Sequence, residues 1–121
     1  MSGKFLISLT HGLDNTDKAT VAFVIANASV ASDKETIVFL SIEGTRLSQL
    51  GAADGVHEEG FAPLKELMDN FAAAGGKMFV CSPCFKKRKL DEHNLVAGAA
   101  VVGGAKLVEF MSDGACPSIS Y

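Results

Sequence analysis

Strand-like and helix-like segments alternate along this chain, and the alternation limits the folds that it can adopt. The β-rich apolar runs lie at 4–10, 36–42, 77–81, 99–102 and 118–121. Helical patterns lie over 17–31, from Pro63 to the Gly75-Gly76 pair, in a short segment that begins at the 81–84 turn, and from Gly104 to Met111. Strands that alternate with helices form a parallel sheet, so we predict an α/β fold with helices on both faces of that sheet.

The segment 46–60 fits neither pattern. It contains three glycines and the acidic Glu58-Glu59 pair, and we expect a loop with room for a short helix. In an open parallel sheet the ligand crevice lies beyond the carboxyl ends of the strands. Four loops are predicted to meet at that edge, namely 11–15, 43–46, 81–84 and 103–104.

Composition indicates one globular domain that covers residues 1–121. The chain is 48% hydrophobic and 21% charged, with a formal net charge of -3. An acidic balance argues against general nucleic-acid binding, and no stretch is apolar for long enough to cross a membrane. The first apolar run is too short for a signal peptide, so we expect a cytoplasmic protein. Three cysteines in such a chain indicate redox or metal chemistry rather than a disulfide scaffold.

The motif Cys81-Ser82-Pro83-Cys84 lies where an apolar strand ends and a short helix begins. Ser82 suits the N-cap and Pro83 suits the first helical position. A thiol at a helix N-terminus, with cations close by, ionises more readily and becomes a nucleophile. We therefore predict that Cys81 is the reactive thiol and that Cys84, one turn into the helix, assists it or resolves a disulfide or persulfide. A small buried hydrophobe is the plainer role for either cysteine.

The third cysteine does not extend this motif into a metal site. Zinc would need a second pair of ligands, and Cys116 and His93 lack the spacing of such a pair. We expect no metal and no cofactor. Cys116 precedes the last strand and is predicted to be structural, at the opposite edge of the sheet.

A basic run follows the motif. Lys86, Lys87 and Arg88 could stabilise an anion at the thiols or dock an acidic partner. A solvated helix face is the plainer explanation for at least two of the four cations in 86–89.

Three further candidates follow the first two strands at the same predicted edge, His11, Glu43 and Gly44. His11 could act as a base near the thiols, and Glu43 could accept a proton. The plainer roles are a loop histidine, a salt bridge from Glu43 to Arg46, and a glycine that permits a tight turn.

The same segments carry a family resemblance that runs nearly end to end. It rests on the opening strand 5–10, on Phe39-Leu40-Ser41-Ile42-Glu43-Gly44, on Val80-Cys81 followed by a basic helix, and on Gly-Ala-Ala-Val-Val-Gly-Gly-Ala-Lys-Leu-Val-Glu-Phe over 98–110. In these segments the chain resembles a small, single-domain DsrE/DsrF-like protein of the sulfur-relay type.

The resemblance implies a three-layer α/β/α sandwich with a five-stranded parallel sheet and flavodoxin-like layering. It also implies a homotrimer or homohexamer, and partner proteins that donate and accept sulfur. In sulfur-transferring members one cysteine after the third strand carries sulfane sulfur as a persulfide, and Cys81 occupies that position. Cys84 departs from the pattern, since a second thiol could attack that persulfide, release sulfide and leave a disulfide.

Three functions stay open at this point. The first is a cytoplasmic sulfurtransferase that carries a persulfide on Cys81. The second is a thioredoxin-like dithiol oxidoreductase that needs both Cys81 and Cys84. The third is a non-enzymatic oligomeric subunit with inert thiols.

Overall fold

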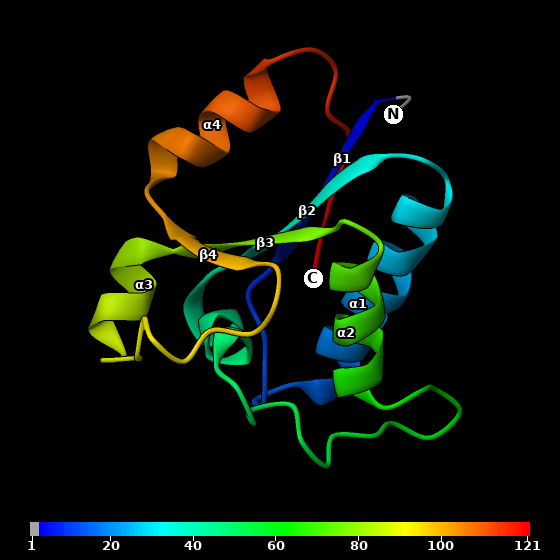
Figure 1. Cartoon of the computed structure of the whole chain (residues 1–121), viewed down its shortest axis with the longest axis vertical. Helices are drawn as coiled ribbons and strands as arrows, with labels where there is room; N and C mark the ends of the chain where they lie inside the picture. Colours follow the sequence, from blue (N-terminus) through cyan, green and yellow to red (C-terminus); the bar gives the residue numbers. More distant parts are fainter. Residues whose placement is uncertain (1–2) are drawn as a thin grey trace.

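The computed structural model of the protein describes residues 3–121 (Figure 1). One sheet of five strands runs in the order β4-β3-β2-β1-β5, and every neighbouring pair is parallel. The strands are β1 (Lys4–Leu9), β2 (Glu35–Leu40), β3 (Lys77–Cys81), β4 (Ala99–Val102) and β5 (Ser118–Ser120). The predicted five-stranded parallel sheet is confirmed.

Helices cover both faces of this sheet, which confirms the three-layer arrangement (Figure 1). The helices are α1 (Thr16–Ala31), α2 (Leu64–Ala73), α3 (Ser82–Lys87) and α4 (Gly104–Ser112), with a 3-10 helix η1 (Ile42–Ser48) after β2. The helices α1 and α2 pack side by side on one face, while α4 lies over the other. Within residues 3–121, every helix is too short or too polar to span a bilayer.

The main core lies between the sheet and the α1–α2 layer. Side chains alternate between the two faces of a strand, so Ile7, Val38 and Val80 point into this layer and are fully buried. Phe23 of α1 and Phe71 of α2 meet them with their rings edge-to-face, 5.9 Å apart. The same core buries one face of α3, which fixes the helix that carries the second cysteine.

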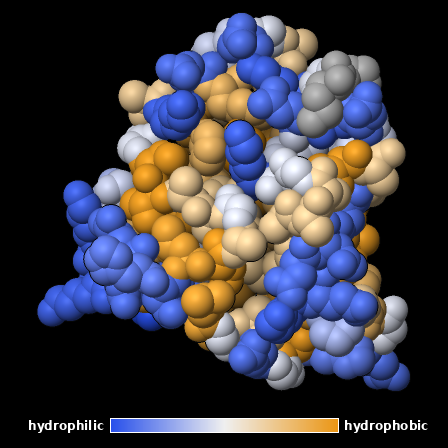
Figure 2. Space-filling model, viewed as in Figure 1, coloured by the Kyte–Doolittle hydropathy of each residue, from blue (hydrophilic) through white to orange (hydrophobic). Residues whose placement is uncertain are grey.

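The opposite face of the sheet has a thinner cover. Leu6, Ile37 and Phe79 are buried there against α4, but no residue of α4 is itself buried. The edge strand β4 pairs only with β3, and hydrophobic surface lies along it, bordered by the hydrophilic surface of α3 (Figure 2). The cover that α4 provides is therefore thin, and Val108 of that helix is 62% exposed.

The second strand is shorter than predicted. It ends at Leu40 instead of Ile42, because Ile42 adopts the left-handed backbone region with φ of 53° and turns the chain into η1. A β-branched residue rarely adopts that conformation, so periodicity could not predict it. The short helix allowed for within 46–60 consequently begins earlier, at the end of β2, and irregular turns follow it up to α2.

The order of connections places the C-x-x-C motif at the carboxyl ends of β3 and β4, where two connections diverge. The chain leaves β3 toward the α1–α2 side, where Phe85 of α3 joins the main core, and leaves β4 toward the α4 side. Cys81 and Val102 are neighbours in register at the ends of these two strands. Connections that diverge from adjacent parallel strands open a crevice beyond their carboxyl ends, which is where such folds bind ligands.

Candidate functional site

The two cysteines flank the first turn of α3. Cys81 ends β3 in an extended conformation and is the N-cap, so the helix begins one residue earlier than predicted, and Pro83 lies at its second position. Phe85 anchors this short helix because its ring is only 1% exposed. Both thiols are half-buried and free of a disulfide, so each is partly open to small reagents.

The loop after β2 reaches the same turn. Gly44 donates its backbone N–H to Thr10 at the end of β1, and a Cβ at Gly44 would lie 2.4 Å from the carbonyl oxygen of Leu9. Only glycine permits this close approach. It holds η1 against the end of β1, and η1 in turn contacts α3. The structure thus brings together the predicted loops 11–15, 43–46 and 81–84.

A carboxylate in η1 joins two arginines. Glu43 Oε1 accepts from Arg46 Nε at 2.9 Å, which confirms the predicted loop salt bridge, and Glu43 Oε2 accepts from Arg88 Nε at 2.8 Å. These hydrogen bonds, first the one from Arg88, lower the pKa of Glu43. The side chain of Arg88 is 11% exposed and donates a further hydrogen bond to the Cys84 carbonyl at 3.2 Å.

The two thiols have different electrostatic surroundings. Burial raises the pKa of Cys81, and the hydrogen bond that it shares with the Cys84 side chain raises it further. The Cys84 amide and Arg88 act in the opposite direction but do not compensate. We expected a lowered pKa for Cys81, and that expectation is wrong, because burial and the Cys84 side chain outweigh the backbone amide at the helix N-terminus.

Cys84 shows the reverse shift. Burial works against ionisation here too, but the Ile42 backbone amide, the Cys81 side chain, Arg88 and Lys87 together lower the pKa of Cys84. Of the two thiols, Cys84 is therefore the one that loses its proton more readily. Neither Ile42 nor the pairing of Glu43 with Arg88 carries a sequence signal that points to the thiols.

The remaining candidates lie around this pair. His11 pairs through Nδ1 with Asp14 Oδ2 at 2.9 Å, so it ties the β1–α1 loop together. Lys86 and Lys87 are exposed on the last turn of α3. Cys116 lies just before β5, at the far edge of the sheet from β3 and β4, as predicted. Within residues 3–121 no group of three or more His, Cys, Asp or Glu side chains is arranged to hold a metal ion.

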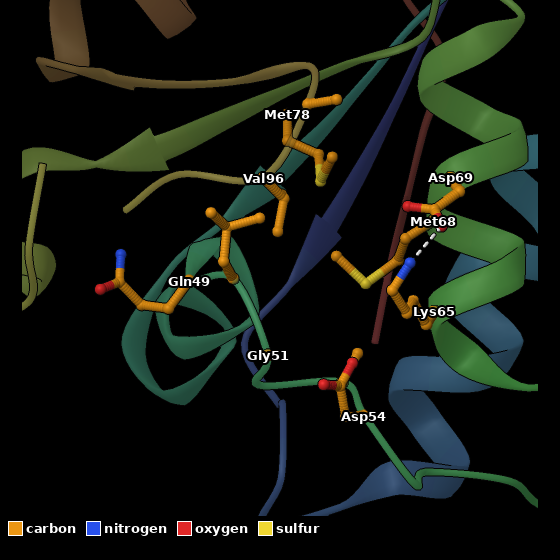
Figure 3. Close-up of a pocket in the computed structure, with 11 residues that line it drawn as sticks. Gln49, Gly51, Asp54, Lys65, Met68, Asp69, Met78 and Val96 are labelled. Atoms are coloured by element: carbon orange, nitrogen blue, oxygen red, sulfur yellow. Dashed lines mark hydrogen bonds and ion pairs between the residues drawn. The ribbon is translucent and has the colours of Figure 1, made fainter. Parts of the chain in front are cut away.

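A separate cavity of about 180 Å³ lies between α2, the loop after η1 and the 96–97 segment (Figure 3). Met68, Met78 and Val96 form its apolar wall, and the ion pair between Lys65 and Asp69, 2.7 Å long, lies at its side (Figure 3). No cysteine lines it. This cavity was not predicted from the sequence.

Known proteins resemble this chain both in sequence and in fold. Residues 3–115 match the sequence profile of the DsrE/DsrF-like family. An uncharacterised protein of Methanocaldococcus jannaschii, MJ0760, is 28% identical over 108 residues, which are 89% of this chain and 39% of that protein. The chain thus spans about two-fifths of the length of that relative.

Two solved structures share the fold. The crystal structure of the ychN protein from E. coli has a TM-score of 0.67 at 12% identity, over 98% of this chain and 99% of that one. MTH1491 of Methanobacterium thermoautotrophicum, a protein of unknown function, has a TM-score of 0.69 at 16% identity, over 99% and 100%. At these identities the likeness concerns the fold alone. Since the profile match leaves only the ends of the chain uncovered, this protein belongs to the DsrE/DsrF-like family.

Proposed function

We propose that the protein is a cytoplasmic sulfur-relay protein, a sulfurtransferase that carries sulfane sulfur as a persulfide on Cys81 while Cys84 assists or resolves. One observation carries the proposal: two free thiols lie at the carboxyl end of β3 and in the first turn of α3, within a chain of the DsrE/DsrF-like family. A thiol pair of this kind is suited to exchange at sulfur, because one member can be ionised while the other keeps a proton.

Loading is a displacement at the outer sulfur of a donor persulfide. The Cys81 sulfur bonds to the sulfane sulfur, the donor S–S bond breaks, and its electron pair leaves on the donor thiolate. The product is Cys81–S–SH. An acceptor thiolate then removes the outer sulfur in the same way, and Cys81 returns as a thiolate.

Cys84 gives the persulfide a second outcome. If its thiolate attacks Cys81 Sγ, the outer sulfur leaves as hydrosulfide and a Cys81–Cys84 disulfide forms. The lowered pKa of Cys84 favours the thiolate that this step needs. The relay thus ends either in transfer to a partner or in release of sulfide, and access of the acceptor decides between them.

The cations around the pair have separate proposed roles. Arg88 and Lys87 favour the negative charge at Cys84. Lys86 is exposed on the last turn of α3 and suits the docking of an acidic donor or acceptor protein.

Dithiol oxidoreductase activity is the second candidate function, and the side-chain hydrogen bond between Cys81 and Cys84 favours it. Such an enzyme would reduce a generic disulfide catalytically and would need both thiols. A sulfur carrier holds the sulfane sulfur on Cys81, so loss of Cys84 can change the rate of loading but does not abolish it. A subunit with inert thiols would react neither with a generic disulfide nor with a persulfide donor.

We also propose that the protein assembles as a homotrimer or homohexamer. Support comes from α4, which buries no residue and leaves Val108 62% exposed above the thinly covered face of the sheet.

The test of function is sulfur loading from a small-molecule persulfide, followed by intact mass. At short times the unmodified chain and a Cys84→Ser variant should both gain one sulfur atom, which only Cys84→Ser keeps when no acceptor is present, and Cys81→Ser should gain none. Cys116→Ser, at the far edge of the sheet, is the matched control and should load normally. Loading that survives in Cys81→Ser would overturn the proposed carrier.

A further inference from the structure

The environment of Cys84 is built by a segment far away in the sequence. Glu43 and Arg88 are 45 positions apart, and their 2.8 Å contact links η1 to the residue that follows α3. The guanidinium of Arg88 is nearly buried and makes its second hydrogen bond to the Cys84 carbonyl. An arginine side chain has many rotatable bonds, so the two hydrogen bonds of the guanidinium, one to Glu43 and one to the Cys84 carbonyl, are what hold Arg88 in place.

The neighbouring residue adds a backbone donor. Ile42 has φ of 53°, a conformation that costs a β-branched residue on the order of 1–3 kcal/mol. Its side chain is 50% exposed, so burial of the side chain does not explain the conformation. The Ile42 backbone amide is one of the groups that lower the pKa of the Cys84 thiol.

The charged and titratable groups that face Cys84 come from two elements. Cys81, Lys87 and Arg88 belong to the α3 turn, and Glu43 belongs to η1. The strands packed against α3 contribute no charge at this end, since β4 is wholly apolar and the only charged residue of β3, Lys77, starts that strand. Arg46 pairs with the other oxygen of Glu43, and its side chain is 42% exposed.

We propose that Glu43 is a positioning residue that holds Arg88 against Cys84, and that Cys84 accepts the proton of Cys81 during sulfur loading. The inference rests on the proposed function for its chemical step. It assigns to Cys84 the task of a general base, in addition to resolution.

The step balances without any further reactant. Cys81–SH, the Cys84 thiolate and a donor R–S–SH give Cys81–S–SH, Cys84–SH and R–S⁻. The bond that forms joins Cys81 Sγ to the sulfane sulfur, and the bond that breaks is the donor S–S bond. The proton passes from Cys81 to Cys84, and the electron pair leaves on the donor sulfur. No net oxidation occurs.

The sign of a charge effect makes the positioning role testable. Glu43 is itself negative, so a purely Coulombic role would oppose the Cys84 thiolate, and loss of the carboxylate would then lower the pKa of Cys84. A positioning role predicts the opposite, because loss of the carboxylate releases Arg88. The two roles therefore predict shifts in opposite directions.

The experiment measures the rate of iodoacetamide alkylation of Cys84 as a function of pH. The background is a chain with Cys81→Ser and Cys116→Ser, so that Cys84 is its one thiol. Serine at position 81 keeps a hydroxyl that can donate a hydrogen bond. Glu43→Ala should raise the apparent pKa by about one unit, a tenfold loss of thiolate at a given pH. Glu43→Gln should raise it less, because its amide oxygen can still accept from Arg88. Arg46→Gln, which removes the other partner of the same carboxylate, should leave it unchanged.

An unchanged or lowered pKa in Glu43→Ala would overturn the positioning role, as would equal effects of Ala and Gln at position 43. If Glu43→Ala does not fold, Arg88→Lys tests the same point, since a lysine cannot make both contacts of the fork and should raise the pKa. Alkylation needs no sulfur donor, so these outcomes stand even if sulfur loading fails.

The general-base step is tested separately in the chain that keeps both thiols. Loading of Cys81 should follow the ionisation of Cys84 and shift to higher pH in Glu43→Ala. Loading with a pH profile that is identical in Glu43→Ala and the unmodified chain would overturn the general-base assignment and leave the proposed carrier intact.

Discussion

Gly44 joins the fold to the thiol site, and replacing it with alanine tests that connection. Its backbone dihedrals lie outside the left-handed region, so the backbone conformation alone would tolerate alanine, and space is what decides. The added Cβ would lie 2.4 Å from Leu9 O, and real Cβ atoms essentially never come closer than 3.0 Å to such a neighbour. Since Leu9 is held by the sheet and η1 by its own hydrogen bonds, a backbone shift of roughly 0.6 Å is required.

The expected cost follows from that overlap. Overpacking of a buried position costs about 1–3 kcal/mol, and the lower entropy of alanine in the unfolded chain offsets about 0.4–1 kcal/mol of it. We expect a net loss of about 1–2 kcal/mol in the free energy of unfolding, which moves the urea midpoint down by about 0.5–1 M. The same shift should move Ile42 and Glu43 and slow alkylation of Cys84.

The matched control is Gly104→Ala, at the first position of α4, where an added Cβ meets nothing within 4 Å. Alanine is the better helix former, so this variant should be as stable as the unmodified chain or more so. A urea midpoint of Gly44→Ala at or above that of the unmodified chain would refute the argument from close approach.

Three further predictions concern other parts of the molecule. The hydrogen bonds from Arg88 and Arg46 lower the pKa of Glu43, so the stability that Glu43 contributes is present above its unfolded pKa and is lost as the pH falls through its folded pKa. Glu43→Gln should therefore flatten the acid side of a plot of Tm against pH. A curve that runs parallel to that of the unmodified chain would contradict this. Phe85→Ala should lower the free energy of unfolding by about 3–5 kcal/mol in urea titrations, because the ring fixes α3 in the main core, and a loss below 1 kcal/mol would show that α3 is held by other contacts. Native mass spectrometry should give three or six copies of the chain, Val108→Glu should reduce that number, and a monomeric unmodified chain would refute self-association.

The strand and helix pattern could be predicted from sequence because each element has a local signal. Asn15 caps α1 by accepting from the Lys18 amide at 3.1 Å, as a polar residue before a helical repeat predicts. At the end of α2, Gly75 adopts φ of 95° and Gly76 returns a hydrogen bond to Phe71, which matches the predicted stop at the glycine pair. These interactions lie within a few residues of each other, so a window of sequence contains them.

The chemistry of the site could be predicted only in part. The C-x-x-C motif located the thiols, and their place at the end of β3 followed from the topology. The choice between the two thiols depends on the amide of a strained Ile42 and on an arginine held by a carboxylate from another loop. Such long-range contacts have no periodicity, and burial and the Cys84 side chain outweigh the helix N-terminus that favoured ionisation of Cys81.

The most direct test of the account is to find which cysteine carries sulfur in the chain with all three thiols. The reduced protein is exposed briefly to a persulfide donor, trapped with an alkylating reagent and mapped by peptide mass spectrometry. The account predicts an alkylated persulfide on Cys81 at early times, followed by a Cys81–Cys84 disulfide and free sulfide when no acceptor is present. A persulfide on Cys84 with Cys81 unmodified, or no added sulfur at either position, would contradict it.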